Sequence, residues 1–132
     1  MEEVIMNTAK TLELLQSEAA YTRMCELYGA EKAEENIRRY GELVKKFREN
    51  FGENDILMFS SPGRTEISGN HTDHNHGKVL AGSINLDCVG IAARNESSRV
   101  NIISETFQQK FTIDLNDLQP SDKKAGTVDL VK

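Results

Sequence analysis

The chain has 132 residues, which is enough for one domain with a core of its own. It carries 16 Lys and Arg against 21 Asp and Glu, a net charge of −5 that no basic cluster offsets. The composition therefore argues against a nucleic-acid partner. The basic pairs at 38–39 and 45–46 lie among glutamates and predict a solvated helix face.

The N-terminus lacks the basic and apolar regions of a signal peptide, and no apolar run approaches about 18 residues. We therefore expect a cytoplasmic protein with no membrane partner. The two cysteines, Cys25 and Cys88, occur in unlike contexts and do not predict a disulfide framework. Cys88 lies in an apolar run and is expected to be a buried thiol.

The first half of the chain is predicted to be helical. Ser17 can cap a short helix over 18–28, and Gly29 would end it. We interpret residues 1–30 as a helical N-terminal extension that packs on the following helix. Residues 31–132 would then form the main domain.

A longer helix is predicted from apolar residues that follow each other at spacings of three and four, and Gly52 would end it. These residues share one face and are Ala33, Ile37, Tyr40, Val44, Phe47 and Phe51. Such a face suits a helix that lies on a sheet, which we favour, although a coiled coil could use the same pattern.

The second half changes to the period of strands. Short strands are expected at 57–60 and at 65–68. The run 85–93 is nearly all apolar, which predicts a strand covered on both faces.

Turn residues at 95–98 predict that the strand 85–93 forms a hairpin with a strand at 100–104. Apolar residues alternate with polar ones over 107–115, as in a half-exposed strand, and 117–127 is expected to be a loop. The predicted fold class is α+β, with helices packed on one face of a mostly antiparallel sheet.

The segment 60–80 has the composition of a binding site, and it reads SSPGRTEISGNHTDHNHGKVL. Glycines allow tight turns and close approach of the backbone to a ligand. Arginine, carboxylate, imidazole and carboxamide groups supply donors and acceptors for a small polar molecule. An ionised carboxylate such as Asp73 can accept hydrogen bonds from two neighbouring hydroxyls, and His71 can add another contact.

This segment resembles the signature of the galactokinases, which are GHMP kinases. In one-letter form the signature runs G-R-x-N-x-x-G-E-H-T-D-Y-N-x-G-x-V-L, and the chain matches it from Gly63 and Arg64 to 79–80. The resemblance extends over roughly residues 43–132. It implies the N-terminal, sugar-binding part of a galactokinase-like fold, whose ATP-phosphate loop and catalytic aspartate would lie downstream.

The resemblance implies roles for four residues. Arg64 matches the catalytic arginine, which favours the ionised form of the attacking hydroxyl and offsets charge on the transferred phosphoryl group. Asn70, His71 and Asp73, together with Arg64, would bind the sugar. Alternatively, Arg64 pairs with Glu66 or Asp73 to hold the loop together, and Asp73 only forms a turn.

The chain departs from the signature at three positions. Asn70 replaces a glutamate that touches the sugar, His74 replaces a tyrosine, and Glu66 replaces an asparagine. Asn70 keeps hydrogen-bonding capacity but lacks the charge, so another hexose or a modified sugar is also compatible with the site.

A metal site is a third interpretation of the same loop. His71, Asp73, His74 and His76 are all ligand types, but their order H-x-D-H-x-H is not the spacing of a known zinc motif. We therefore predict no metal in this chain.

Two functions remain as hypotheses. The first is the sugar-binding part of a kinase that phosphorylates galactose or a related sugar at its anomeric hydroxyl. ATP and Mg²⁺ would serve the full-length enzyme, and the chain alone would bind neither and be inactive. The second is an inactive sugar-binding sensor or interaction module. We also expect exposed apolar area and strand edges to cause self-association of the chain.

Overall fold

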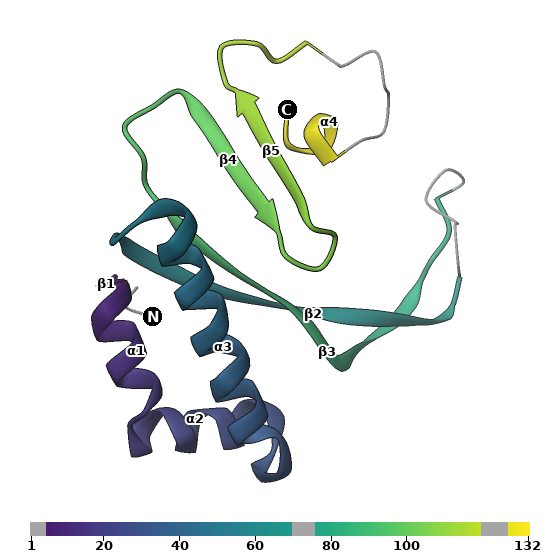
Figure 1. Ribbon diagram of the computed structural model, residues 1–132. Helices are drawn as coiled ribbons and strands as arrows, with labels where there is room; N and C mark the ends of the chain where they lie inside the picture. Colours follow the sequence, from purple (N-terminus) through teal and green to yellow (C-terminus); the bar gives the residue numbers. More distant parts are fainter. Residues whose placement is uncertain (1–4, 70–75, 120–126) are drawn as a thin grey trace. The chain divides into compact units, whose positions relative to one another are not determined.

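The computed structural model describes residues 5–69, 76–119 and 127–132. The chain divides into two compact units, Met1–Arg94 and Asn95–Lys132 (Figure 1). The first unit contains β1 (Met6–Asn7), α1 (Thr8–Leu15), α2 (Glu18–Tyr28), α3 (Ala30–Phe51), β2 (Asp55–Ser68) and β3 (Leu80–Ala93). The second unit contains β4 (Arg99–Ser104), β5 (Gln109–Asp114) and α4 (Thr127–Val131).

The two helices that precede α3 have side-chain caps at their first turns. The side chain of Asn7 accepts a hydrogen bond from the backbone N–H of Lys10, which begins α1. Ser17 accepts one from Ala20 and begins α2, and Gly29, at a φ of 83°, ends it. The predicted helix over 18–28 is therefore confirmed, whereas α1 was not resolved as a separate helix from the sequence.

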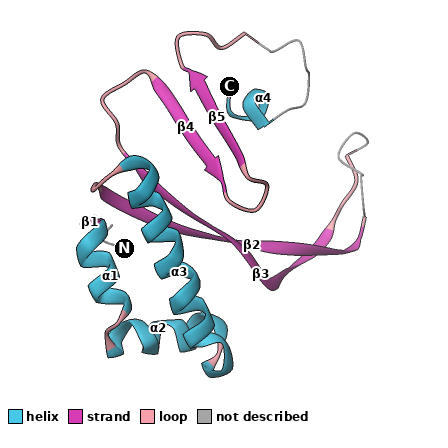
Figure 2. Ribbon diagram, in the orientation of Figure 1, coloured by secondary structure: helices cyan, strands magenta, loops and turns pink. Residues whose placement is uncertain are grey.

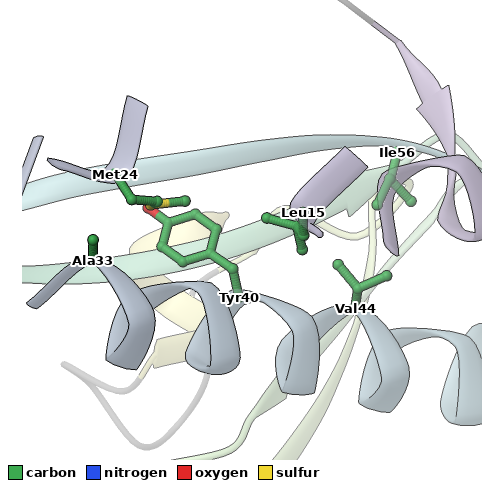
Figure 3. Packing of buried hydrophobic residues seen from close by; sticks show 6 residues of the cluster. All are labelled: Leu15, Met24, Ala33, Tyr40, Val44 and Ile56. Carbon is green, nitrogen blue, oxygen red and sulfur yellow. The ribbon is translucent and has the colours of Figure 1, made fainter. Parts of the chain in front are cut away.

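The helix α3 buries most of the predicted apolar face, but Phe51 at its C-terminal end is exposed. Ala33, Tyr40 and Val44 are buried, and Gly52 follows the helix as its C-terminal cap. These side chains point toward Leu15 and Met24 of the preceding helices and Ile56 of β2 (Figure 3). The packing against β2 and β3 confirms a helix on a sheet rather than a coiled coil.

Helices cover one face of an antiparallel sheet in the order β1-β2-β3, as the predicted α+β class requires (Figure 2). Side chains on the covered face include Met58, Val89, Ile91 and Ala93. The boundary predicted after residue 30 stays a prediction. Leu15, on α1, belongs to the same cluster as the α3 residues.

The prediction of two short strands at 57–60 and 65–68 is wrong, because β2 runs without interruption from Asp55 to Ser68. It pairs with β3 from Ile56 opposite Ala93 to Ser68 opposite Leu80. The irregular residues in the middle are absorbed by a β-bulge, which keeps both strands extended.

The expected hairpin between 85–93 and 100–104 is also wrong. The strand β3 pairs with β2, and β4 pairs with β5 from Arg99 opposite Asp114 to Ser104 opposite Gln109. The four-residue turn 105–108 brings β4 and β5 together at short sequence separation. The alternating strand predicted within 107–115 is confirmed as β5, where Ile113 is buried.

Two burial predictions fail on β3. The strand is not covered on both faces, since Leu86 is 72% exposed. Cys88 is also exposed rather than buried. Side chains alternate along a strand, so Cys88 points away from the helices that its neighbour Asp87 contacts. Among the described helices, none is long and apolar enough to cross a membrane.

Candidate functional site

The structure describes one of the four predicted site residues. Arg64 lies on β2, whereas Asn70, His71 and Asp73 lie outside the described residues. Of the histidines in the metal interpretation, His76 alone is described; it is exposed and has a φ of 57°. Within the described ranges, no three His, Cys, Asp or Glu side chains gather in a way that could hold a metal ion.

Arg64 presents its guanidinium group to solvent. It stands opposite Ser83 on β3, and its side chain is 75% exposed. Its Nη2 lies 3.7 Å from Oε1 of Glu66, two residues along the same strand. This is one of the ion pairs that the sequence suggested, and an exposed pair of this length is weak. The guanidinium therefore stays accessible to a ligand.

Gly63, directly before Arg64, occupies the bulge between β2 and β3. Pro62 pairs with Asp87 and Arg64 pairs with Ser83, so the single residue Gly63 faces the residues 84–86. A Cβ at Gly63 would lie 3.1 Å from two side-chain atoms of Ile84. The absence of a side chain therefore lets Ile84 pack directly against the strand that carries Arg64.

Gly69 directly precedes the segment that contains the other predicted site residues. Its φ is 90°, a left-handed conformation that disfavours other residues. A Cβ at Gly69 would also collide with the backbone carbonyl of Lys78. The chain thus passes very close to itself at the two ends of the segment 70–77. This is the close backbone approach expected of glycines in this region.

A largely buried carboxylate that the sequence pattern did not indicate, Asp87, lies on β3 opposite Pro62. Oδ1 of Asp87 accepts a hydrogen bond of 2.6 Å from Nη1 of Arg39. Its Oδ2 accepts one of 2.6 Å from Ser60 and one of 2.5 Å from Tyr28. We call these four residues the Asp87 cluster. Its signals in the sequence are one acidic residue in an apolar strand and one arginine next to Tyr40, a residue of the predicted buried face.

The electrostatics of the Asp87 cluster favour the ionised carboxylate. Burial acts to raise the pKa of Asp87, but the hydrogen bonds from Ser60, Tyr28 and Arg39 outweigh it and hold the pKa at about 2. Burial, together with the bond to Asp87, raises the pKa of Tyr28 above its ordinary value. The cluster therefore pairs a carboxylate with a guanidinium and a neutral phenol at ordinary pH.

Arg39 was predicted to lie on a solvated helix face, and this is wrong. It also donates from Nη2 to the backbone carbonyl of Asp87, at 2.9 Å. Together the two residues line a hollow of about 270 Å³ between α3 and β3, which also includes Lys32 and Asn36. The guanidinium of Arg39 and the carboxylate of Asp87, which face this hollow from α3 and β3, are therefore bound to each other.

Comparison with known proteins identifies the region that contains Arg64 and the bulge. Residues 45–94 match the family described as the galactokinase galactose-binding signature. The match begins in the second half of α3 and ends one residue after β3.

The chain is similar to several curated galactokinases. The galactokinase of Lactococcus lactis subsp. lactis (strain IL1403) is 38% identical over 93 residues, which are 70% of this chain and 23% of the relative. The galactokinase of Clostridium tetani (strain Massachusetts / E88) is 33% identical over 91 residues, which are 69% of this chain and 23% of the relative. That of Enterococcus faecalis (strain ATCC 700802 / V583) is 34% identical over 82 residues, 61% of this chain and 21% of the relative.

The chain thus spans about a quarter of the length of the galactokinases it matches, in their N-terminal part. No solved structure matches it significantly. The similarity supports a galactose-binding region.

Proposed function

We propose that the chain forms the sugar-binding part of a galactokinase-like kinase, which transfers the γ-phosphoryl group of ATP to the anomeric hydroxyl of galactose or a related sugar. Residues 31–132 would supply the sugar site, with 1–30 as a helical extension. The observation that carries the proposal is the galactose-binding signature over 45–94, which includes the exposed Arg64.

In this proposal Arg64 approaches the hydroxyl that is phosphorylated. A guanidinium at that place lowers the cost of deprotonating the hydroxyl and offsets negative charge on the phosphoryl group. Its exposure on β2 and its weak pair with Glu66 leave it available for this role. Asn70, His71 and Asp73 would bind further hydroxyls of the sugar, which rejects analogues that lack them.

ATP and Mg²⁺ belong to the whole kinase in this proposal, where they supply the phosphoryl group and neutralise its charge. We assign neither of them to described residues of this chain. The chain on its own is therefore expected to bind sugar without phosphorylating it.

Calorimetric titration of the chain with galactose, glucose and a control polyol tests the proposal. Galactose should bind, Asp73→Ala should abolish binding, and Arg64→Ala should weaken it by about tenfold, or about 1.4 kcal/mol. Arg23→Ala is a matched control, because Arg23 is also exposed and pairs with one glutamate, Glu26. Equal affinity for galactose and for the polyol would contradict the proposal.

The alternative of an inactive sugar-binding module is favoured by the replacements at Asn70 and His74. Activity of the chain joined to the sequence that follows it in its gene separates the two functions. Phosphoryl transfer that falls in Arg64→Ala supports the kinase. Sugar binding without transfer in that longer protein supports the module.

A further inference from the structure

The Asp87 cluster lies at the point where the β2–β3 ribbon loses its regular pairing. Pro62 faces Asp87 in the last regular pair, and the next pair joins Arg64 to Ser83. One residue on β2 and three on β3 lie between these pairs. The bulge thus separates two parts of the β2–β3 pair. One part packs against the helices, and the other carries Arg64.

The Asp87 cluster connects the part of β2 and β3 that lies before the bulge to the helices α2 and α3. Arg39 reaches Asp87 from α3, and Tyr28 reaches it from the last turn of α2. Ser60 binds the same carboxylate from the neighbouring strand. One side chain therefore connects four elements, α2, α3, β2 and β3, directly before the bulge.

Arg64 continues the face of the ribbon on which the cluster lies. Side chains two residues apart on a strand share a face, so Ser60, Pro62 and Arg64 follow each other on one side. The Cα of Arg64 is about 7 Å along the strand from that of Pro62, the partner of Asp87. Arg64 is therefore the next side chain on that face beyond the bulge.

On the β3 side, the bulge packs against the strand that carries Arg64. Ile84 lies against Gly63 so closely that a Cβ there would be 3.1 Å from its atoms. Asp87 follows the bulge directly and is fixed by its three partners. Asp87 therefore fixes the C-terminal end of the segment 84–86, which packs against Gly63.

We infer that Asp87 is a positioning residue for Arg64, which holds the bulge at 84–86 against Gly63 and so directs the guanidinium toward the sugar. The part of the inference that concerns sugar binding rests on the proposed function of Arg64. The part that concerns the position of 84–86 does not depend on that function. It assigns a functional part to a carboxylate that lies within the matched region 45–94 but outside the segment 60–80.

A double-mutant cycle on galactose affinity tests whether Asp87 acts through Arg64. Asp87→Asn should weaken binding about tenfold, and the milder Ser60→Ala about threefold. Combined with Arg64→Ala, neither should cause a further loss, since the guanidinium that they position is absent. Asp114→Asn is the control; Asp114 is an exposed carboxylate that pairs with Arg99, and its loss should leave affinity unchanged.

Losses that simply add to that of Arg64→Ala would overturn the inference and leave Asp87 a stabilising residue. If Asp87→Asn fails to fold, the double-mutant cycle with Ser60→Ala tests the inference alone.

A second measurement, made without sugar, distinguishes failure of this inference from failure of the proposed function. In Ser60→Ala, amide hydrogen exchange should accelerate at 63 and 84–86 but stay unchanged in the middle of α3. This result is expected even if the chain binds no galactose. Exchange that accelerates everywhere, or that does not change at all, would reject the inference.

Discussion

Arg39 and Asp87 are joined twice, by a 2.6 Å ion pair between side chains and by a 2.9 Å hydrogen bond from the guanidinium to the backbone carbonyl. The Asp87 side chain is only 9% exposed. The Arg39 side chain is 39% exposed, so the pair is partly buried, and it is not by itself evidence of net stabilisation because both charges lose hydration. Removing one partner, however, leaves the other charge uncompensated. The relationship between α3 and β3 is therefore sensitive to substitution at either residue.

The first prediction concerns stability at acid pH. The pKa of Asp87 falls from 3.8 to about 2 in the folded chain. Because the unfolded chain then binds the proton more readily, stability is fully present above about pH 4 and is lost toward about pH 2. The lowering corresponds to roughly 2 kcal/mol. Urea titrations at several pH values measure this loss.

The control for this prediction is Asp87→Asn, which cannot titrate. Its free energy of unfolding should be lower than that of the wild type at pH 7, and the two should converge as pH falls toward 2. Parallel curves over the whole range would show that Asp87 does not have a lowered pKa in the folded state.

The second prediction uses two glycines of the β2–β3 ribbon. Gly69→Ala should weaken galactose binding strongly, because the new Cβ would meet the carbonyl of Lys78 at a positive φ. Gly82→Ala should have little effect, since no atom lies within 4 Å of a Cβ there. Calorimetry with galactose compares the two variants. Equal affinities would mean that the close approach at Gly69 is not needed for the site.

The third prediction concerns glycines of α3. Gly41 lies in the middle of the helix and nothing would contact its Cβ, so Gly41→Ala should stabilise the chain by about 1 kcal/mol. Gly52 follows the helix at a φ of 79°, and Gly52→Ala should destabilise it by about 1 kcal/mol. Chemical denaturation measures both. Effects of the same sign would contradict the backbone argument.

The helices could be predicted from the sequence because their signals are local. Ser17 and Gly29 mark the two ends of α2, and Gly52 marks the end of α3. The spacing of Ala33, Tyr40 and their neighbours on α3 identifies its buried face without any knowledge of the partner. The fold class followed from these elements and from the change to a strand period.

Strand pairing and the Asp87 cluster could not be predicted in the same way. Strand pairing depends on tertiary contacts and not on separation in the sequence alone. The strand β3 pairs with β2, although β4 is closer to it in the sequence. The bonds from Arg39 to Asp87 cross 48 positions of the chain. The site predicted from the composition of 60–80 stays a prediction, and of its proposed residues the structure describes Arg64, which is exposed on β2.

The last prediction concerns self-association. Within the part of the chain that the structure describes, β3 pairs only with β2, so its other edge has unpaired backbone groups along 14 residues. The strand has one charged side chain, Asp87, which already binds Arg39. Long edges with few charges favour pairing with a second chain. Light scattering should therefore show a mass that rises with protein concentration.

A charge on the exposed part of β3 should oppose this association. Leu86 is 72% exposed, and Leu86→Lys should shift the chain toward the monomer. Phe107→Lys is the matched control, because Phe107 is equally exposed but lies in the turn between β4 and β5. If both variants reduce association equally, general hydrophobicity rather than the β3 edge drives it. A wild-type chain that stays monomeric at every concentration would refute the prediction altogether.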